Sequence, residues 1–237
     1  MIGFDPVYFI FILPALALSL WASFRTRSAF NKYSRVRTMR GLTGAQAAKA
    51  MLDRAGIYDV QVVATHGMLT DHYNPANKTL NLSEGVYASN SVAAAGIACH
   101  EAGHAIQHAE GYKPLWLRSL LVPTANIGSS LGYLVMMFGL FMVYAGSKMG
   151  DEVVLLGAGL FSLVLAFQIV TLPVEFDASS RAKRMAVENG IVMQQEREGF
   201  DRVLNAAALT YVAAVISTLM TLLYFLFRSG LLGGRRD

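Results

Sequence analysis

Residues 153–172 read VVLLGAGLFSLVLAFQIVTL, an uncharged stretch in which Gln168 is the most polar side chain. A helix needs roughly 20 mostly apolar residues to cross the hydrocarbon core of a bilayer. A soluble helix of this length normally carries a polar face, and this stretch has none. We therefore expect Val153–Leu172 to span a membrane, which sets the class of the fold.

Three further stretches have the same character, namely Val7–Phe24, Leu120–Ala145 and Ala206–Phe227. Over the whole chain 54% of residues are hydrophobic and 15% are charged, against about a quarter charged in soluble domains. The first stretch has no Lys or Arg before it and is long for a signal peptide, so we expect it to be retained. The sequence predicts a mainly α, polytopic membrane protein with four transmembrane helices.

Basic residues indicate the orientation of these helices. They gather after the first stretch, before the second, and between the third and fourth: Arg25, Arg27, Lys32, Arg35, Arg37, Arg40, Lys113, Arg118, Arg181, Lys183, Arg184, Arg197 and Arg202. The turn Gly146–Glu152 contains only Lys148, while three arginines after the last stretch run against the trend. Because positively charged loops stay in the cytoplasm, we expect a multi-pass plasma-membrane protein with its long loops and active site on the cytoplasmic side.

The chain therefore divides into five parts: 1–24, the first span; 25–117, a cytoplasmic domain; 118–172, the second and third spans; 173–205, a cytoplasmic segment; and 206–237, the fourth span with a tail. Within residues 25–117 we expect a helix capped by Thr43 and ending at Gly56, and a second helix over Ser91–Glu110. Short strands are predicted at Val60–Ala64 and Thr79–Leu82, with a turn at Asn74–Asn77 between extended segments. This part is a small α+β domain.

The second helix carries the segment His100-Glu101-Ala102-Gly103-His104. Residues four apart on a helix are offset by about 40° and about 6 Å along the axis. Both imidazoles can therefore bind one zinc ion at about 2.1 Å. Glu101 is placed to take a proton from a zinc-activated water. The competing interpretation is two solvated histidines beside an unrelated glutamate, but this pattern is rare by chance.

A catalytic zinc ion takes three protein ligands and keeps one position open. His108 lies about 12 Å from His100 along a straight helix, too far to share one ion, and is expected to be a supporting or surface residue. Glu175 is the better third ligand, because two spans separate it from the motif and an even number of crossings returns the chain to the same side. Asp177 is a candidate hydrogen-bond partner for a ligating imidazole. We expect one Zn²⁺ per chain.

The four apolar stretches, the segment 100–104 and the segment Glu175-Phe176-Asp177-Ala178 resemble the YugP-type neutral zinc metallopeptidases, the zinc peptidase 2 family. The segments 69–75 and 82–83 share this likeness, which covers essentially the whole chain. More distantly the chain is similar to the HtpX and Ste24 membrane peptidases, whose ligand motif ends in Asp where this chain has Ser179. The supporting carboxylate is therefore either Asp177 or absent.

This resemblance implies a cytoplasmic zincin-like core that hydrolyses peptide bonds, with membrane or misfolded proteins as substrates. His72, Tyr73 and Tyr211 are candidates to stabilise the oxyanion, although each residue type is more often structural. Peptide substrates often add to a sheet edge as an extra strand. We expect that edge to be formed by Thr79, Leu80, Asn81 and Leu82.

Other functions were weighed against a zinc metalloendopeptidase. A membrane scaffold or sensor with a structural or vestigial metal site is one alternative, but structural zinc usually has four protein ligands and Cys99 is the one cysteine. A small transporter would need intramembrane charges that the spans lack, and nucleic acid is not an expected partner. The small residues of Gly128–Gly132 predict a close helix contact, within one chain or between copies in a homo-oligomer.

Overall fold

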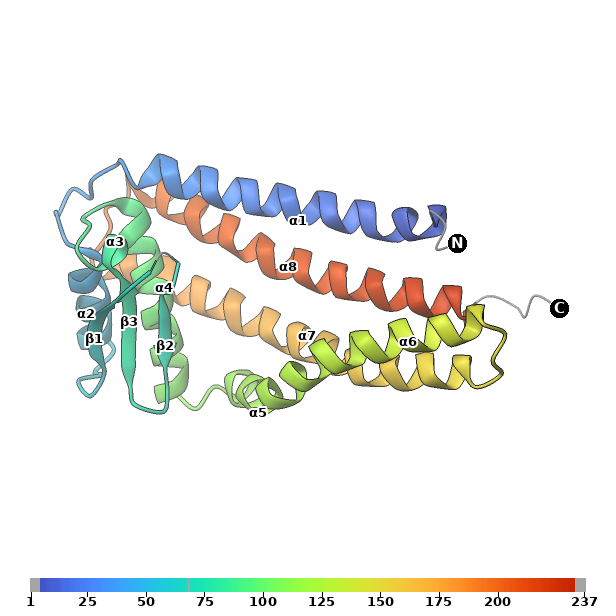
Figure 1. Ribbon diagram of the computed structural model, residues 1–237. Coiled ribbons are helices and arrows are strands. Elements are labelled where there is room, and N and C mark those ends of the chain that lie inside the picture. Colours follow the sequence, from blue (N-terminus) through green and yellow to red (C-terminus); the bar gives the residue numbers. More distant parts are fainter. Residues whose placement is uncertain (1–4, 68, 233–237) are drawn as a thin grey trace. The chain divides into compact units, whose positions relative to one another are not determined.

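The computed structural model describes residues 5–67 and 69–232. Within these residues the protein is mainly helical, with one small sheet (Figure 1). The elements in chain order are α1 (Pro6–Tyr33), α2 (Gly44–Arg54), β1 (Gln61–Thr65), β2 (His72–Asn74), β3 (Thr79–Ser83), α3 (Glu84–Tyr87), α4 (Val92–Ala109), α5 (Lys113–Ile127), the π-helix η1 (Gly128–Gly132), α6 (Tyr133–Tyr144), α7 (Gly150–Glu188) and α8 (Arg197–Arg228).

The described residues form two compact units. The apolar unit comprises residues 5–21, Leu117–Leu172 and 211–232, and the polar unit comprises residues 22–116 and Pro173–Thr210. Four helical segments are long and apolar enough to cross a membrane: Pro6–Tyr33, Lys113–Tyr144, Gly150–Glu188 and Arg197–Arg228. Three of them contain a predicted span, and Lys113–Tyr144 covers all of Leu120–Ala145 except its last residue, which confirms the predicted class of fold.

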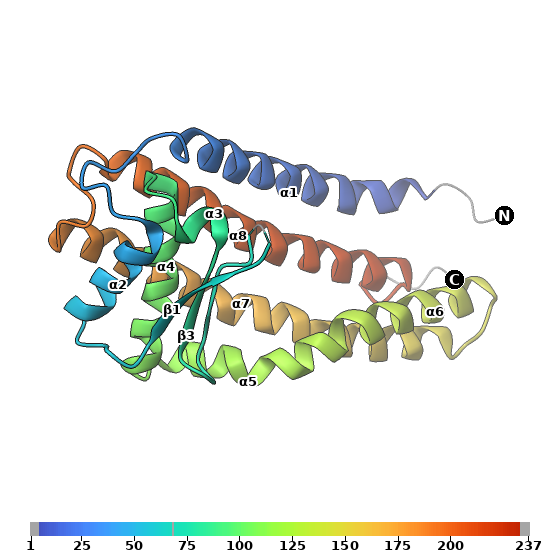
Figure 2. The same cartoon turned by 60° about the vertical axis from the view of Figure 1, so that its left-hand side comes forward.

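The predicted small-residue contact lies within one chain, between η1 and α7. A Cβ atom added to Gly132 would lie 2.7 Å from the backbone nitrogen of Phe161, and one added to Gly128 would lie 2.5 Å from the carbonyl oxygen of Leu160. Because only glycine allows such an approach, the two backbones pack directly against each other. The contact continues into α6, which lies beside α7 (Figure 2).

Polar side chains join three helices at one end of the apolar unit. The hydroxyl of Tyr224 donates to Asp5 at 2.9 Å, and Nε of Arg228 lies 3.0 Å from the same carboxylate. Arg228 also donates to the hydroxyl of Tyr144 at the end of α6. These contacts tie the start of α1 to the ends of α6 and α8.

In the polar unit, the predicted helix signals are confirmed. Thr43 caps α2 in a capping box with Gln46, and Gly56 follows the helix with φ +73°. Ser91 caps α4 by accepting from the backbone of Ala94. The predicted strands occur as β1 and β3, each shifted or extended by a residue at its ends.

The order of strands in the sheet is β1-β3-β2, with β1 parallel and β2 antiparallel to β3. The prediction that Thr79–Leu82 forms a sheet edge is therefore wrong, because β3 is the central strand. The turn at Asn74–Asn77 folds β2 back onto β3, and β1 pairs along the other side. The edges of the sheet are β1 and β2.

A core of small residues between α2 and α4 supports this unit. Ala47, Ala48 and Met51 on α2 are fully buried, as is Ala98 on α4. Cys99 is also fully buried, and burial raises the pKa of its thiol to about 12. This cysteine is a buried packing residue.

Candidate metal centre

Helices α4 and α7 touch through their backbones beside the histidine motif. A Cβ atom added to Gly103 would lie 2.7 Å from the carbonyl oxygen of Ala178. Ala102 and Ala178 are fully buried in this contact region. Because Gly103 has no side chain to separate the helices, the turn of α7 that carries Glu175 comes within reach of both imidazoles.

The three residues predicted to bind zinc come together at this contact. Oε2 of Glu175 lies 3.2 Å from Nε2 of His100 and 3.5 Å from Nε2 of His104. One donor atom from each residue lies within 4.8 Å of the other two. Glu175 is 2% exposed and His104 7%. Two imidazole nitrogens and one carboxylate oxygen form a donor set that zinc accepts, and the protein supplies the three ligands typical of a catalytic site.

The electrostatics of this cluster favour a cation. Burial opposes a charge on Glu175, but hydrogen bonds from His100 and His104 outweigh it and hold the pKa of the carboxyl far below its usual value. Burial also opposes a charge on His104, yet its hydrogen bond to Glu175 and the nearby Glu101 carboxylate raise the pKa of the imidazole. The pocket therefore stabilises a positive charge next to an ionised carboxylate.

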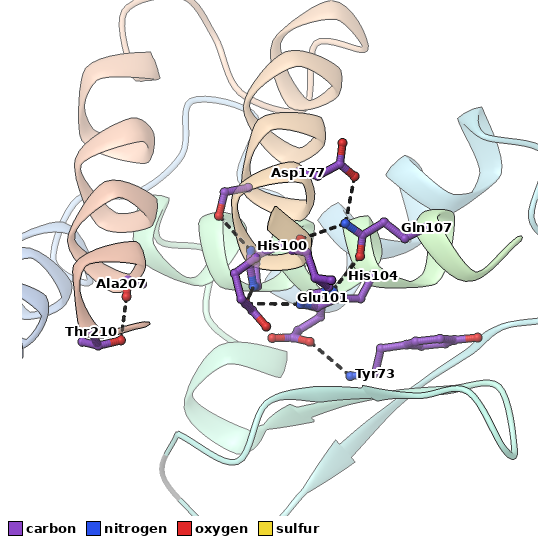
Figure 3. A network of polar contacts seen from close by, with 11 residues as sticks. Tyr73, His100, Glu101, His104, Gln107, Asp177, Ala207 and Thr210 are labelled. Carbon is purple, nitrogen blue, oxygen red and sulfur yellow. Dashed lines mark hydrogen bonds and ion pairs between the residues drawn. The ribbon is translucent and has the colours of Figure 1, made fainter. Parts of the chain in front are cut away.

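Gln107 supports His104 and was not identified from the sequence. Its amide nitrogen donates to the carbonyl oxygen of Val174 and to Oδ2 of Asp177, each at 2.8 Å (Figure 3). Its amide oxygen is thus left to accept from Nδ1 of His104 at 3.0 Å. A proton on Nδ1 leaves the lone pair of Nε2 free to bind a metal. The only hint in the sequence is that Gln107 lies one helical turn after His104.

Asp177 is connected to His104 through Gln107, which differs from the predicted direct hydrogen bond. It contacts Gln107 instead of hydrogen-bonding an imidazole directly, and Gln107 in turn contacts His104. Arg181 donates to Asp177 at 2.5 Å and to Glu110, at the end of α4, at 2.6 Å. This chain of polar contacts fixes α7 against α4 behind the cluster.

His100 is supported by Ser179. The hydroxyl of Ser179 lies 3.1 Å from Nδ1 of His100. Ser179 is buried, with 6% of its surface exposed. The resemblance to the more distant peptidases implied an aspartate at this position, and Ser179 supplies a neutral hydroxyl instead. The interaction partner of His100 is therefore present, but it carries no charge.

Glu101 lies beside the three-residue cluster and contacts the sheet. Its Oε2 atom accepts a hydrogen bond of 3.1 Å from the backbone nitrogen of Tyr73 in β2 (Figure 3). Glu101 is buried, with 9% of its surface exposed. Since β2 is an edge strand, the edge of the sheet next to the cluster is β2 and not β3.

The other candidates from the sequence are not members of the three-donor cluster. His72 is exposed on β2, with Nδ1 donating to the carbonyl oxygen of Thr70 at 2.7 Å. His108 is exposed and bonds the hydroxyl of Tyr73 at 2.8 Å, outside the three-donor cluster. Tyr211 belongs to the apolar unit. His72 and Tyr211 remain predictions as oxyanion-stabilising residues.

Comparison with known proteins identifies the family of the chain. A family described as "Putative neutral zinc metallopeptidase" matches residues 8–230, so the chain belongs to this family of zinc peptidases. The chain is 46% identical over 218 residues to "Putative membrane protease YugP" of Bacillus subtilis (strain 168), covering 92% of this chain and 94% of that protein. No solved structure matches significantly. The resemblance stated from the sequence is confirmed.

Proposed function

We propose that this protein is a membrane-embedded zinc endopeptidase with one zinc ion per chain held by His100, His104 and Glu175. The observation that carries the proposal is the convergence of these three side chains beside a separate buried carboxylate, Glu101. Zinc, when bound there, supplies a Lewis acid that polarises a carbonyl group and makes water acidic near neutral pH.

Glu101 is the general base and then the general acid. Its carboxylate takes one proton from the attacking water, and the same proton passes to the nitrogen of the leaving amine as the peptide bond breaks. The backbone N–H of Tyr73 holds Oε2, which orients the carboxylate. Gln107 and Ser179 keep the two imidazoles turned with Nε2 toward the cluster.

The substrate binds as an extended strand along β2. This strand is an edge of the sheet, and the backbone nitrogen of Tyr73 faces Glu101 rather than the neighbouring strand. Strand addition uses backbone hydrogen bonds and so requires an unfolded segment. Membrane or misfolded proteins are therefore the proposed substrate class, met on the cytoplasmic side.

The test uses purified full-length protein in detergent and an unfolded protein as substrate. Cleavage should stop with a chelator and return with zinc. Glu101→Gln should keep its zinc and lose about a hundredfold or more in rate, whereas Glu175→Ala should lose both zinc, by metal analysis, and cleavage.

The exposed Glu188→Gln on the same helix as Glu175 is the matched control and should behave as wild type. Full activity in Glu101→Gln would remove the mechanism. A protein that holds zinc but cleaves no unfolded substrate would instead support the scaffold or sensor.

A further inference from the structure

A cavity of about 630 Å³ lies between α1 and α8 in the polar unit, apart from the metal centre. Arg25 and Lys32 line it from α1, and Arg202 lines it from α8. Ser28 and Asn205 add polar groups from the same two helices, and Ala29 and Leu209 are among its apolar walls. No acidic residue is among the described residues that line it.

The walls of this cavity are held by close contacts between the two helices. The hydroxyl of Thr26 donates to the carbonyl oxygen of Ala206 at 2.8 Å. A Cβ atom added to Gly199 would lie 2.6 Å from the ring of Tyr33, which itself lines the cavity. The space is therefore part of the packed structure and not a gap between loosely associated helices.

The groups that line the cavity suit an anion rich in oxygen acceptors. Lys183, which is outside the lining, donates to the side-chain oxygen of Asn205 at 2.5 Å, so this oxygen already has a donor. Arg202 pairs with Glu198 one turn away, and Lys32 lies over the ring of Tyr33 at 5.2 Å. Among the described residues, the lining itself contains three cationic side chains and no carboxylate. Guanidinium, ammonium, hydroxyl and amide donors are the groups that bind phosphate oxygens.

The position of these residues along the chain suggests the source of the anion. Arg25 comes directly after the apolar stretch that ends at Phe24, and Ala206 begins the fourth apolar stretch. The cavity thus lies where two candidate spans leave the hydrocarbon core, at the level of the lipid phosphates. Its apolar walls suit the first part of an acyl chain.

We infer that this cavity binds the headgroup phosphate of an anionic phospholipid, with Arg25, Lys32 and Arg202 as its cationic contacts. A free phosphate shares this chemistry, but it would make no use of the apolar walls. The inference does not depend on peptidase activity, because lipid binding is measured directly.

The test titrates the purified full-length protein in detergent with dioctanoyl phosphatidylglycerol or dioctanoyl phosphatidylcholine and counts bound lipid by native mass spectrometry. The anionic lipid should fill one saturable site at least about tenfold more tightly than the zwitterionic one. Combining Arg25→Gln, Lys32→Gln and Arg202→Gln should weaken it on the order of a hundredfold. The single change Lys32→Gln, at an exposed side chain, should weaken it roughly fivefold.

Two matched variants separate the cavity from general charge. Arg27→Gln, Arg35→Gln and Arg184→Gln together remove the same charge from exposed positions outside the cavity and should leave binding within about twofold of wild type. Ala29→Phe keeps every charge and fills part of the cavity, so it should weaken binding by about tenfold or more.

Several outcomes would overturn the inference. Equal affinity for the two lipids, or equal losses of lipid affinity in the two triple variants, would mean that the three cations act only as non-specific surface charge. Unchanged binding in both Ala29→Phe and Lys32→Gln would exclude the cavity even if the triple variant failed to fold. If inorganic phosphate competed as strongly as the lipid, the ligand of the cavity would be a soluble phosphate and not a phospholipid.

Discussion

Oε2 of Glu175 lies 3.2 Å from Nε2 of His100, although the two residues are 75 positions apart in the sequence. The apolar helical segment Lys113–Tyr144 and the apolar first part of α7 come between them in the chain. The contact depends on the backbone approach of α4 and α7 at Gly103 and Ala178. Because the ligands come from distant parts of the sequence, their geometry depends on the packing of α4 against α7.

Gly103→Ala should disturb the metal centre although the new methyl group touches no ligand. Its Cβ would lie 2.7 Å from the Ala178 carbonyl oxygen, so α7 must shift away from α4. We expect a loss of about 1–3 kcal/mol in stability and a clear fall in zinc content, measured by thermal unfolding and metal analysis.

Gly96→Ala on the same helix is the control for that substitution. Its Cβ would meet Val203 at 3.8 Å, an ordinary van der Waals contact. The change should be neutral or stabilise the helix by roughly 0.5–1 kcal/mol. If both alanine variants bound zinc as the wild type does, the backbone contact would not be what positions Glu175.

Gln107→Leu should weaken zinc binding without touching a ligand atom. The change removes the acceptor for Nδ1 of His104 and the link to Asp177. Loss of such a supporting partner typically costs about 10–100-fold in metal affinity. The measurement is zinc affinity in a chelator competition, with Gln107→Glu as the variant that keeps an acceptor for Nδ1.

Gln107→Glu should therefore recover part of the affinity that Gln107→Leu loses. Its second oxygen would face the carbonyl oxygen of Val174 and the Asp177 carboxylate, so full recovery is not expected. Equal zinc affinity in the wild type and in Gln107→Leu would contradict the supporting role.

Tyr73→Pro tests the corrected sheet edge. Proline removes the backbone N–H that holds Glu101, at the edge strand along which the substrate is proposed to bind. Cleavage of an unfolded protein should fall by about a hundredfold or more, while zinc content stays near that of the wild type.

Tyr73→Phe keeps that N–H and loses only the hydroxyl bond to His108. It should retain most of the cleavage activity. If the proline variant cleaved as fast as the phenylalanine variant, substrate would not depend on this edge, and β2 would have to be abandoned as its binding strand.

The chelated protein should show a characteristic dependence of stability on pH. The pKa of Glu175 is lowered from 4.5, so its contribution is present above pH 4.5 and is lost as the pH falls toward the lower folded value. The pKa of His104 is raised from 6.5, so its contribution is present below pH 6.5 and is lost as the pH rises through the higher folded value.

Both contributions are complete between pH 4.5 and 6.5. Thermal unfolding of the metal-free protein should therefore show higher stability in that window than on either side. Glu175→Gln should flatten the profile, because the carboxylate that raises the pKa of His104 is gone. A flat wild-type profile would mean that the two groups do not interact in solution.

The features that the sequence determined by itself are those that depend on neighbouring residues. The length and apolar composition of Val153–Leu172 indicate a helix able to span a membrane, and the four-residue spacing of His100 and His104 places both rings on one helical face. Thr43 and Gly56 mark the ends of α2 through local features: the capping box of Thr43 with Gln46, and the positive φ of Gly56. Even Glu175 could be proposed, because counting spans requires no coordinates.

Only the tertiary structure decided what depends on which distant segments pack together. From the sequence, β3 was predicted to be an edge strand. It is the central strand because β2 folds back onto one side of it and β1 pairs along the other. Ser179 and Gln107 reach the imidazoles because Gly103 lets α7 approach α4. Hydrogen bonds and backbone contacts between segments far apart in the chain leave no periodic signal in the sequence, so their partners emerge only when the chain is folded.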